Sequence, residues 1–214
     1  MSTHKLSTKT LLNSGVFVWY DSFMQKKKFS IVCYLKDDNL KKVRSLQKEL
    51  FDLTGSHACI DAWLPHITVG DGIHVNDKEL AEIEKSIADL ASGQNIFQVA
   101  IGGFGGLTDR KGGLDEITTP YVLWIDVNVN EKLQNLVQII NKQVTLKYDL
   151  WYKMPQPYTP HVTLAFRDLT EKGYNEGMEF LSKKEFSDDV KISHISLVEK
   201  LPDVDVEYRR FNLA

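Results

Sequence analysis

The sequence predicts an α+β protein in which two similar lobes, each a mostly antiparallel sheet covered by helices, enclose a central cleft. Strand and helix patterns alternate along the chain, and the same order of elements occurs in both halves. A Pro-His-x-Thr tetrapeptide also stands at the equivalent place in each half, at residues 65–68 and 160–163. These three observations together favour a duplicated, bilobal architecture.

The first half is expected to contain three strands separated by two helices. In order they are strand 28–35, helix 37–55, strand 58–70, helix 76–93 and strand 95–107. The strands are rich in apolar and β-branched residues, and the helices carry their apolar residues at helical spacing. Gly55 is a suitable stop for the first helix and Asn76 a suitable cap for the second.

The second half repeats this order and adds one strand. It is expected to run through strand 121–129, helix 130–144, strand 160–169, helix 170–186 and strands 190–199 and 206–213. Between the halves, residues 102–116 are rich in glycine but lack the Gly-x-x-x-x-Gly-Lys-Ser/Thr pattern of a phosphate loop. They predict a flexible hairpin or inter-lobe loop, with a mobile rim over the cleft as the alternative.

The length and composition fit a single bilobal domain over residues 28–214, preceded by an N-terminal extension over 1–27. A net charge of −3 argues against a protein that grips long nucleic acid, although a few local cations suffice for a small phosphorylated ligand. No apolar run approaches the roughly 18 residues of a membrane span. Cys33 and Cys59 lack ligand or disulfide spacing and predict reduced core residues. We therefore expect a cytoplasmic monomer that makes no contact with a membrane.

The repeated His-x-Thr pattern carries the chemistry. Side chains two residues apart in a strand lie on the same face, so His66 pairs with Thr68 and His161 with Thr163. Imidazole can accept or donate a proton near neutral pH, and a threonine hydroxyl can donate a hydrogen bond to a phosphate oxygen. Two such strands across a cleft would supply a base, an acid and two phosphate donors for in-line displacement at phosphorus.

A packed core histidine is the commoner explanation of a single His-x-Thr strand. Two matching copies, each preceded by proline, in a chain with six histidines favour the functional interpretation. His4, His57, His74 and His194 do not stand beside Cys, Asp or Glu at ligand spacing, so neither a zinc site nor any other metal or cofactor is expected.

The duplicated motif resembles the two-histidine (2H) phosphoesterase superfamily, which includes 2'-5' RNA ligases and RNA 2',3'-cyclic phosphodiesterases. The resemblance rests on Pro65-His66-Ile67-Thr68 and Pro160-His161-Val162-Thr163 and covers roughly residues 28–213. It implies a sheet-lined cleft, catalysis by His66 and His161 without a metal, phosphate binding by Thr68 and Thr163, and a small nucleotide or RNA end as the substrate.

The second motif departs from the pattern of many bacterial members, which place arginine five residues after the histidine. Phe166 holds that position here, and Arg167 follows it. Arg167 shares the parity of His161 and would face the cleft as a phosphate-binding residue if the strand stays regular. Three aromatic residues near the motifs are candidates for stacking on a base, with core or rim packing as the alternative: Trp63, Trp151 and Tyr158.

The leading interpretation is a phosphodiesterase that opens 2',3'-cyclic phosphates to 2'-phosphates. Hydrolysis of 2',5'-linked or cyclic oligonucleotides or of ADP-ribose cyclic phosphate, and a non-catalytic nucleotide- or RNA-binding module, remain alternatives. The two motifs are so similar that the sequence does not settle which histidine is the acid. Our initial preference is His161 as the base and His66 as the acid.

Overall fold

The computed structural model describes residues 9–11, 17–19, 26–109, 120–151 and 159–214. Its strands are β1 (Lys9–Leu11), β2 (Phe17–Trp19), β3 (Lys27–Tyr34), β4 (His66–Val75), β5 (Phe97–Leu107), β6 (Val122–Val127), β7 (Asp149–Leu150), β8 (His161–Ala165), β9 (Ser187–Ile192), β10 (His194–Lys200) and β11 (Asp205–Asn212). Its helices are α1 (Asp37–Thr54), α2 (Ala58–Asp61), α3 (Asp77–Ser92), α4 (Glu131–Gln143) and α5 (Glu171–Ser182), with a 3₁₀ turn at Thr145–Lys147.

Two antiparallel sheets form the body of the protein, which confirms the predicted α+β class with two lobes. The first sheet has the order β11-β10-β3-β4-β7, and the second has the order β8-β6-β5-β9. The strands β1 and β2 pair only with each other. The predicted division of the chain between residues 27 and 28 remains a prediction.

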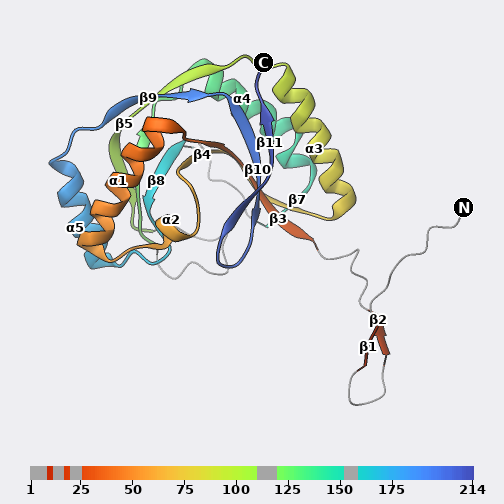
Figure 1. Cartoon of the computed structure of the whole chain (residues 1–214), viewed down its shortest axis with the longest axis horizontal. Coiled ribbons are helices and arrows are strands. Elements are labelled where there is room, and N and C mark those ends of the chain that lie inside the picture. The colour runs from red at the N-terminus through yellow and green to blue at the C-terminus, as the bar shows by residue number, and fades with distance from the viewer. Residues whose placement is uncertain (1–8, 12–16, 20–25, 110–119, 152–158) are drawn as a thin grey trace, which may run out of the picture.

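The lobes do not follow the two halves of the sequence. β5 from the first half pairs with β6 and β9 in the second sheet, whereas β10 and β11 from the C-terminal end join β3 in the first sheet. The helices are exchanged between the two lobes in the same way. Figure 1 shows α1 and α5 together over the second sheet and α3 and α4 together over the first. Each lobe is therefore completed by segments from the other half, which joins the two lobes through a shared core.

Local sequence signals account for the helix ends. Gly55 ends α1 in the left-handed conformation at φ 75°, and its N–H donates to the Phe51 carbonyl. Asn76 caps α3 in a capping box with Glu79, and Asn130 accepts from the backbone N–H of Leu133 at the start of α4. The residues expected on the buried faces of α3 and α4 are buried.

The predicted strand over 58–70 is only partly correct. Residues 58–61 form the short helix α2, and β4 begins at His66 and continues to Val75. His74, which falls between the predicted strand ending at residue 70 and the predicted helix beginning at residue 76, therefore lies in a strand. The register of β4 against β3 shifts around Ile31, and Gly72 adopts a positive φ of 80°. A β-bulge therefore allows β4 to continue past glycines that, in the sequence, are typical of a turn.

The glycine-rich segment is also more regular than expected, because β5 continues through Gly102–Gly106 to Leu107. Gly103, at φ 75°, lies at a register shift between Ile101 and Phe104. Residues 110–116 of this segment lie outside the described part of the chain. Cys33 and Cys59 are buried and unpaired, as predicted. Among the described residues, no helix has the length and apolar character needed to cross a membrane.

Candidate active site

The two His-x-Thr strands meet at the boundary between the sheets. β4 lies inside the first sheet, β8 forms an edge of the second, and the two strands contact each other without ladder pairing. In β4 the alternate residues Ile67 and Val69 are buried in the core, while His66 and Thr68 on the other face are half-buried. β8 repeats this pattern with buried Val162 and Leu164 and half-buried His161 and Thr163. Both motifs therefore turn their polar face away from the helix-covered core.

Both imidazoles are held by the same local hydrogen bond. His66 Nδ1 lies 2.7 Å from the Leu64 carbonyl oxygen, and His161 Nδ1 lies 2.8 Å from the Thr159 carbonyl oxygen. Because a carbonyl oxygen can only accept, each contact places the proton of the neutral ring on Nδ1. Nε2 then carries the lone pair, so it is the nitrogen that can exchange a proton with substrate.

A cation influences the first imidazole. Burial lowers the pKa of His66 to about 4, with the Lys200 ammonium acting in the same direction. The Leu64 carbonyl and the carboxylates of Asp205 and Asp71 act in the opposite direction but do not outweigh these effects. The Tyr34 ring packs edge-on against His66 at 5.9 Å between centroids. His66 is therefore neutral at pH 7 and suited to accept a proton.

A carboxylate and an indole adjoin the second imidazole. Asp126 in β6 is the register partner of His161 in β8, and cross-strand partners lie on the same face of a sheet. The Trp124 ring lies 5.0 Å from the His161 ring, tilted by 35°, and its Nε1–H donates to Asp126 Oδ1 at 2.8 Å. Gly105 in β5 makes room for the indole, because a Cβ there would lie 2.5 Å from Trp124 Nε1. The second imidazole therefore shares its face of the sheet with a carboxylate and an indole.

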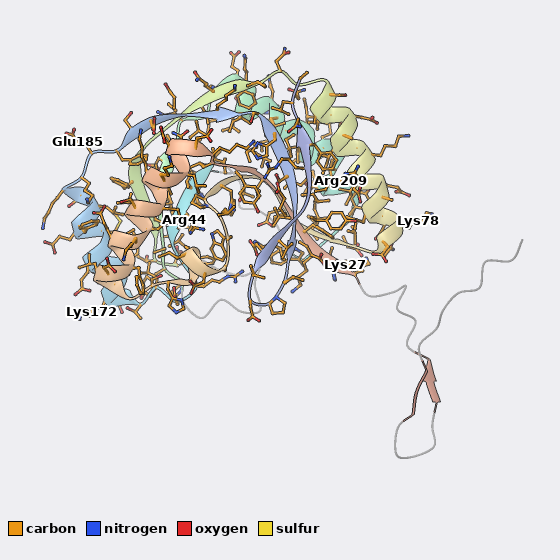
Figure 2. The ribbon with its side chains drawn as sticks, viewed as in Figure 1. Lys27, Arg44, Lys78, Lys172, Glu185 and Arg209 are labelled. Carbon is orange, nitrogen blue, oxygen red and sulfur yellow. The ribbon has the colours of Figure 1, made fainter. Side chains whose placement is uncertain are left out.

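A buried polar network connects the two motifs through α1. Arg44 of α1, labelled in Figure 2, donates to the carbonyls of Cys59 and Trp63 and to the side-chain oxygen of Gln47, each at 2.9 Å. Gln47 is 1 % exposed and donates to the Thr163 carbonyl at 3.0 Å. One face of α1 thus holds both the segment that leads into His66 and the backbone of the second motif.

Arg167 does not extend the second motif as expected. β8 ends at Ala165, and Arg167 has a positive φ of 69°, so the strand parity that would turn it to the side of His161 is lost. Its guanidinium lies 4.7 Å from the centre of the Trp63 ring. Phe166, at the position that relatives often give to arginine, is buried against the same ring at 6.4 Å.

The aromatic residues proposed for base stacking are separated in the structure. Trp63 is only 8 % exposed and packs with Phe166, which is the core-packing alternative. Trp151 is anchored by its backbone to Gly72, toward the far end of β4 from His66, and Lys28 lies over its ring at 5.3 Å. Tyr158 lies outside the described residues. The stacking role of Trp63, Trp151 and Tyr158 therefore stays a prediction.

Among the described residues, His194 and a surface pocket are the other features that we considered as functional sites. Burial lowers the pKa of His194 to about 4, and its Nε2 has no hydrogen-bond partner in the described part of the chain. A surface pocket of about 560 Å³ lies between α1 and α2, lined by Arg44, Lys48, Phe51, His57, Ile60 and Asp61, so it includes neither His-x-Thr motif. Within the described ranges, no group of three or more His, Cys, Asp or Glu side chains is placed to hold a metal ion.

Sequence reasoning missed Trp124, Asp126, Tyr34 and Lys200. One usable signal was Asp126, an acidic residue in the middle of an otherwise apolar strand pattern, with Trp124 two residues before it on the same face. Lys200 and Tyr34 come from strands far from both motifs in sequence. Tyr34 reaches His66 because the two residues are partners in the pairing of β3 with β4. Lys200 comes close to the segment before His66 through the β10–β11 hairpin, where its ammonium lies 5.7 Å from the centre of the Trp63 ring.

Comparisons with known proteins agree with this arrangement. A family model described as "2'-5' RNA ligase superfamily" matches residues 72–203, which is more than half of the chain and includes the second motif. The protein TT0787 of Thermus thermophilus is 17 % identical with a TM-score of 0.62, over 87 % of this chain and 97 % of that one. E. coli LigT complexed with 3'-AMP is 14 % identical with a TM-score of 0.62, over 88 % and 99 %. No curated protein matches the chain significantly in sequence.

Proposed function

Because the chain belongs to the 2'-5' RNA ligase superfamily, we propose that it is a phosphodiesterase that opens 2',3'-cyclic phosphates of RNA ends or small nucleotides to 2'-phosphates. The observation that carries the proposal is the matched pair of His-x-Thr strands in contact, with both imidazoles held alike through Nδ1. The complex of E. coli LigT with 3'-AMP supports a nucleotide as the class of substrate.

The charges near the two rings favour His66 as the base and His161 as the acid, which is the reverse of the assignment preferred from the sequence. His66 lies near Lys200 and is neutral, so it serves as the base. His161 lies opposite Asp126, a carboxylate on the same face of the sheet, so we assign it the role of the acid. A pair of like groups with different surroundings is the usual means of separating acid from base in one site.

The reaction then proceeds by in-line displacement at phosphorus. His66 Nε2 takes a proton from water, and the water oxygen forms a bond to phosphorus as the bond to the ribose 3'-oxygen breaks. His161 Nε2 donates its proton to that 3'-oxygen, which leaves a 2'-phosphate. The hydroxyls of Thr68 and Thr163 donate hydrogen bonds to the non-bridging oxygens, where negative charge accumulates.

Turnover of a 2',3'-cyclic nucleotide by the wild type and by His66→Ala and His161→Ala tests the proposal. Each substitution is expected to lower kcat by about 10²–10⁴-fold, the usual contribution of a positioned acid or base. Separation of 2'- from 3'-phosphate products identifies the bond that breaks. Undiminished turnover in either variant, or nucleotide binding with no turnover over a panel of cyclic and 2',5' phosphodiesters, would contradict the proposal.

A further inference from the structure

The ring of Trp63, three residues before His66, is the meeting point of two cations. The Arg167 guanidinium lies 4.7 Å from its centre and the Lys200 ammonium 5.7 Å. Phe166 packs on it as well. Arg167 is therefore placed as a partner of a buried aromatic ring, and such an arrangement contributes to stability through both packing and cation–π attraction.

Lys200 approaches the same place from the first sheet. It is the last residue of β10, and by alternation it shares a face with Ser196 and Val198, opposite the core-facing Leu197. Its side chain is 17 % exposed and is paired with Asp205 across the β10–β11 hairpin. The Asp205 N–H donates to the Ala62 carbonyl at 2.8 Å. This contact fixes the hairpin against the segment that leads into His66.

Lys200 is also the charge with the largest effect on the His66 ring, ahead of Asp205 and Asp71. A phosphate positioned for attack by a water on His66 would lie within the field of the same ammonium. Asp205 holds Lys200 with one oxygen, and its other oxygen, Oδ1, is buried with no hydrogen-bond partner among the described residues. The carboxylate thus fixes the lysine and offsets part of its charge.

We propose that Lys200 is the cation that binds the reacting phosphate on the His66 side of the site. Lys200 has the role that the sequence predicts for Arg167. The backbone of Arg167 departs from the strand conformation, and its guanidinium packs on the Trp63 ring. The inference rests on the proposed function, since it assigns a substrate contact at the same site. Asp205 is a positioning residue for Lys200, because it acts on the phosphate only through the lysine.

Binding of inorganic phosphate to the purified full chain tests this assignment without any turnover. NMR signals of the His66 ring, assigned with His66→Ala, report both phosphate occupancy and the pKa of the ring. Lys200→Gln is expected to weaken phosphate binding roughly tenfold or more, as for the loss of a charge-assisted hydrogen bond, and Lys200→Arg to retain most of it. The exposed Lys85 of α3 provides the charge-matched control, Lys85→Gln, with affinity unchanged within about twofold.

The pKa of His66 separates an electrostatic role from a structural one. The groups acting on the ring are Lys200 from β10, Asp205 from β11, Asp71 from β4 and the Leu64 carbonyl. Lys200→Gln should raise this pKa and Asp205→Asn should lower it, whereas general loosening of the hairpin would move both variants in the same direction. Phosphate affinity unchanged in Lys200→Gln, or a larger loss in Arg167→Gln than in Lys200→Gln, would overturn the proposal.

Turnover distinguishes failure of this inference from failure of the proposed function. If the wild type opens cyclic phosphates but Lys200→Gln keeps its kcat/KM within about twofold, only the role of Lys200 is wrong. If the wild type turns over no phosphodiester of the panel, the proposed function fails. The phosphate titration still decides whether Lys200 binds the anion at His66.

Discussion

The two halves of the site share a backbone but differ in charge. In each half a His-x-Thr strand alternates buried core residues with half-buried polar residues, and the histidine is held through Nδ1 by the carbonyl two residues earlier. The first half adds Tyr34 and Lys200 around His66, whereas the second adds Trp124 and Asp126 around His161. The duplicated scaffold supplies two similar positions, and the neighbouring elements place a cation near one histidine and a carboxylate on the same face as the other.

The largest expected effect comes from a substrate that needs no acid. An aryl phosphodiester such as a p-nitrophenyl ester expels a stable leaving group, so the proton from His161 matters little. We expect His161→Ala to lose about 10²–10⁴-fold on a 2',3'-cyclic nucleotide but to approach wild-type rates on the aryl ester. His66→Ala should lose a similar factor on both substrates, because each still requires an activated water. Steady-state kcat values for both variants and both substrates measure this.

The reverse pattern, with His66→Ala rescued by the aryl ester, would restore our initial preference for His161 as the base. Equal losses on the aryl ester would show that the two rings do not differ in role. Thr68→Val and Thr163→Val serve as matched controls, since each removes a phosphate donor of one motif and neither should be rescued by the leaving group.

The next effect is on the pH dependence of kcat/KM. A base works only when unprotonated, so activity that depends on neutral His66 is lost as the pH falls through its pKa of about 4. We expect an acid limb near pH 4, with a fall of about tenfold per pH unit below it. If His66 were the acid, kcat/KM would instead fall tenfold per unit as the pH rises above about 4. Circular dichroism at each pH distinguishes loss of catalysis from acid unfolding. This control is needed because the pKa of buried His194 is also lowered to about 4, so its protonation would destabilise the fold over the same pH range.

Much of this arrangement could be predicted because its signals are local. The apolar and β-branched composition of β3 and β6, the apolar spacing in α1, α3 and α4, and the caps at Asn76 and Asn130 depend on a few neighbouring residues. The paired histidines and threonines were found for the same reason, because strand parity alone places His66 beside Thr68 and His161 beside Thr163.

The remaining features depend on contacts that are distant in sequence. The crossing of β5 and β10 between lobes is set by strand pairing, which periodicity does not encode. Arg167 was expected to follow strand parity, but β8 ends at Ala165 and Arg167 has a positive φ of 69°. Lys200 becomes relevant to His66 only because the β10–β11 hairpin lies against Ala62 and Trp63, more than 130 residues earlier in the chain.

The smallest expected effect concerns two glycines, one from each half of the site. A Cβ at Gly105 would lie 2.5 Å from Trp124 Nε1, so Gly105→Ala must displace the indole that lies against His161 and donates to Asp126. A Cβ at Gly70 in β4 would meet Ile140 Cγ2 at 2.8 Å and Thr145 Oγ1 at 2.9 Å, on the helix side of the first sheet. Both substitutions overpack the protein and should lower the free energy of unfolding by about 1–3 kcal/mol.

Only Gly105→Ala should also lower kcat, by about tenfold to a hundredfold. The displaced Trp124 indole no longer holds the His161 ring in place, and a small misplacement of a catalytic group lowers the rate by such factors. Gly70→Ala is the matched control, since its clash faces α4 and leaves the face that carries His66 unchanged. Urea unfolding measures the stability of each variant, and kcat is compared under conditions where both are folded. Equal losses of kcat in the two variants would mean that Trp124 does not position His161. A loss confined to Gly105→Ala would show that the second histidine depends on the support of the Trp124 indole.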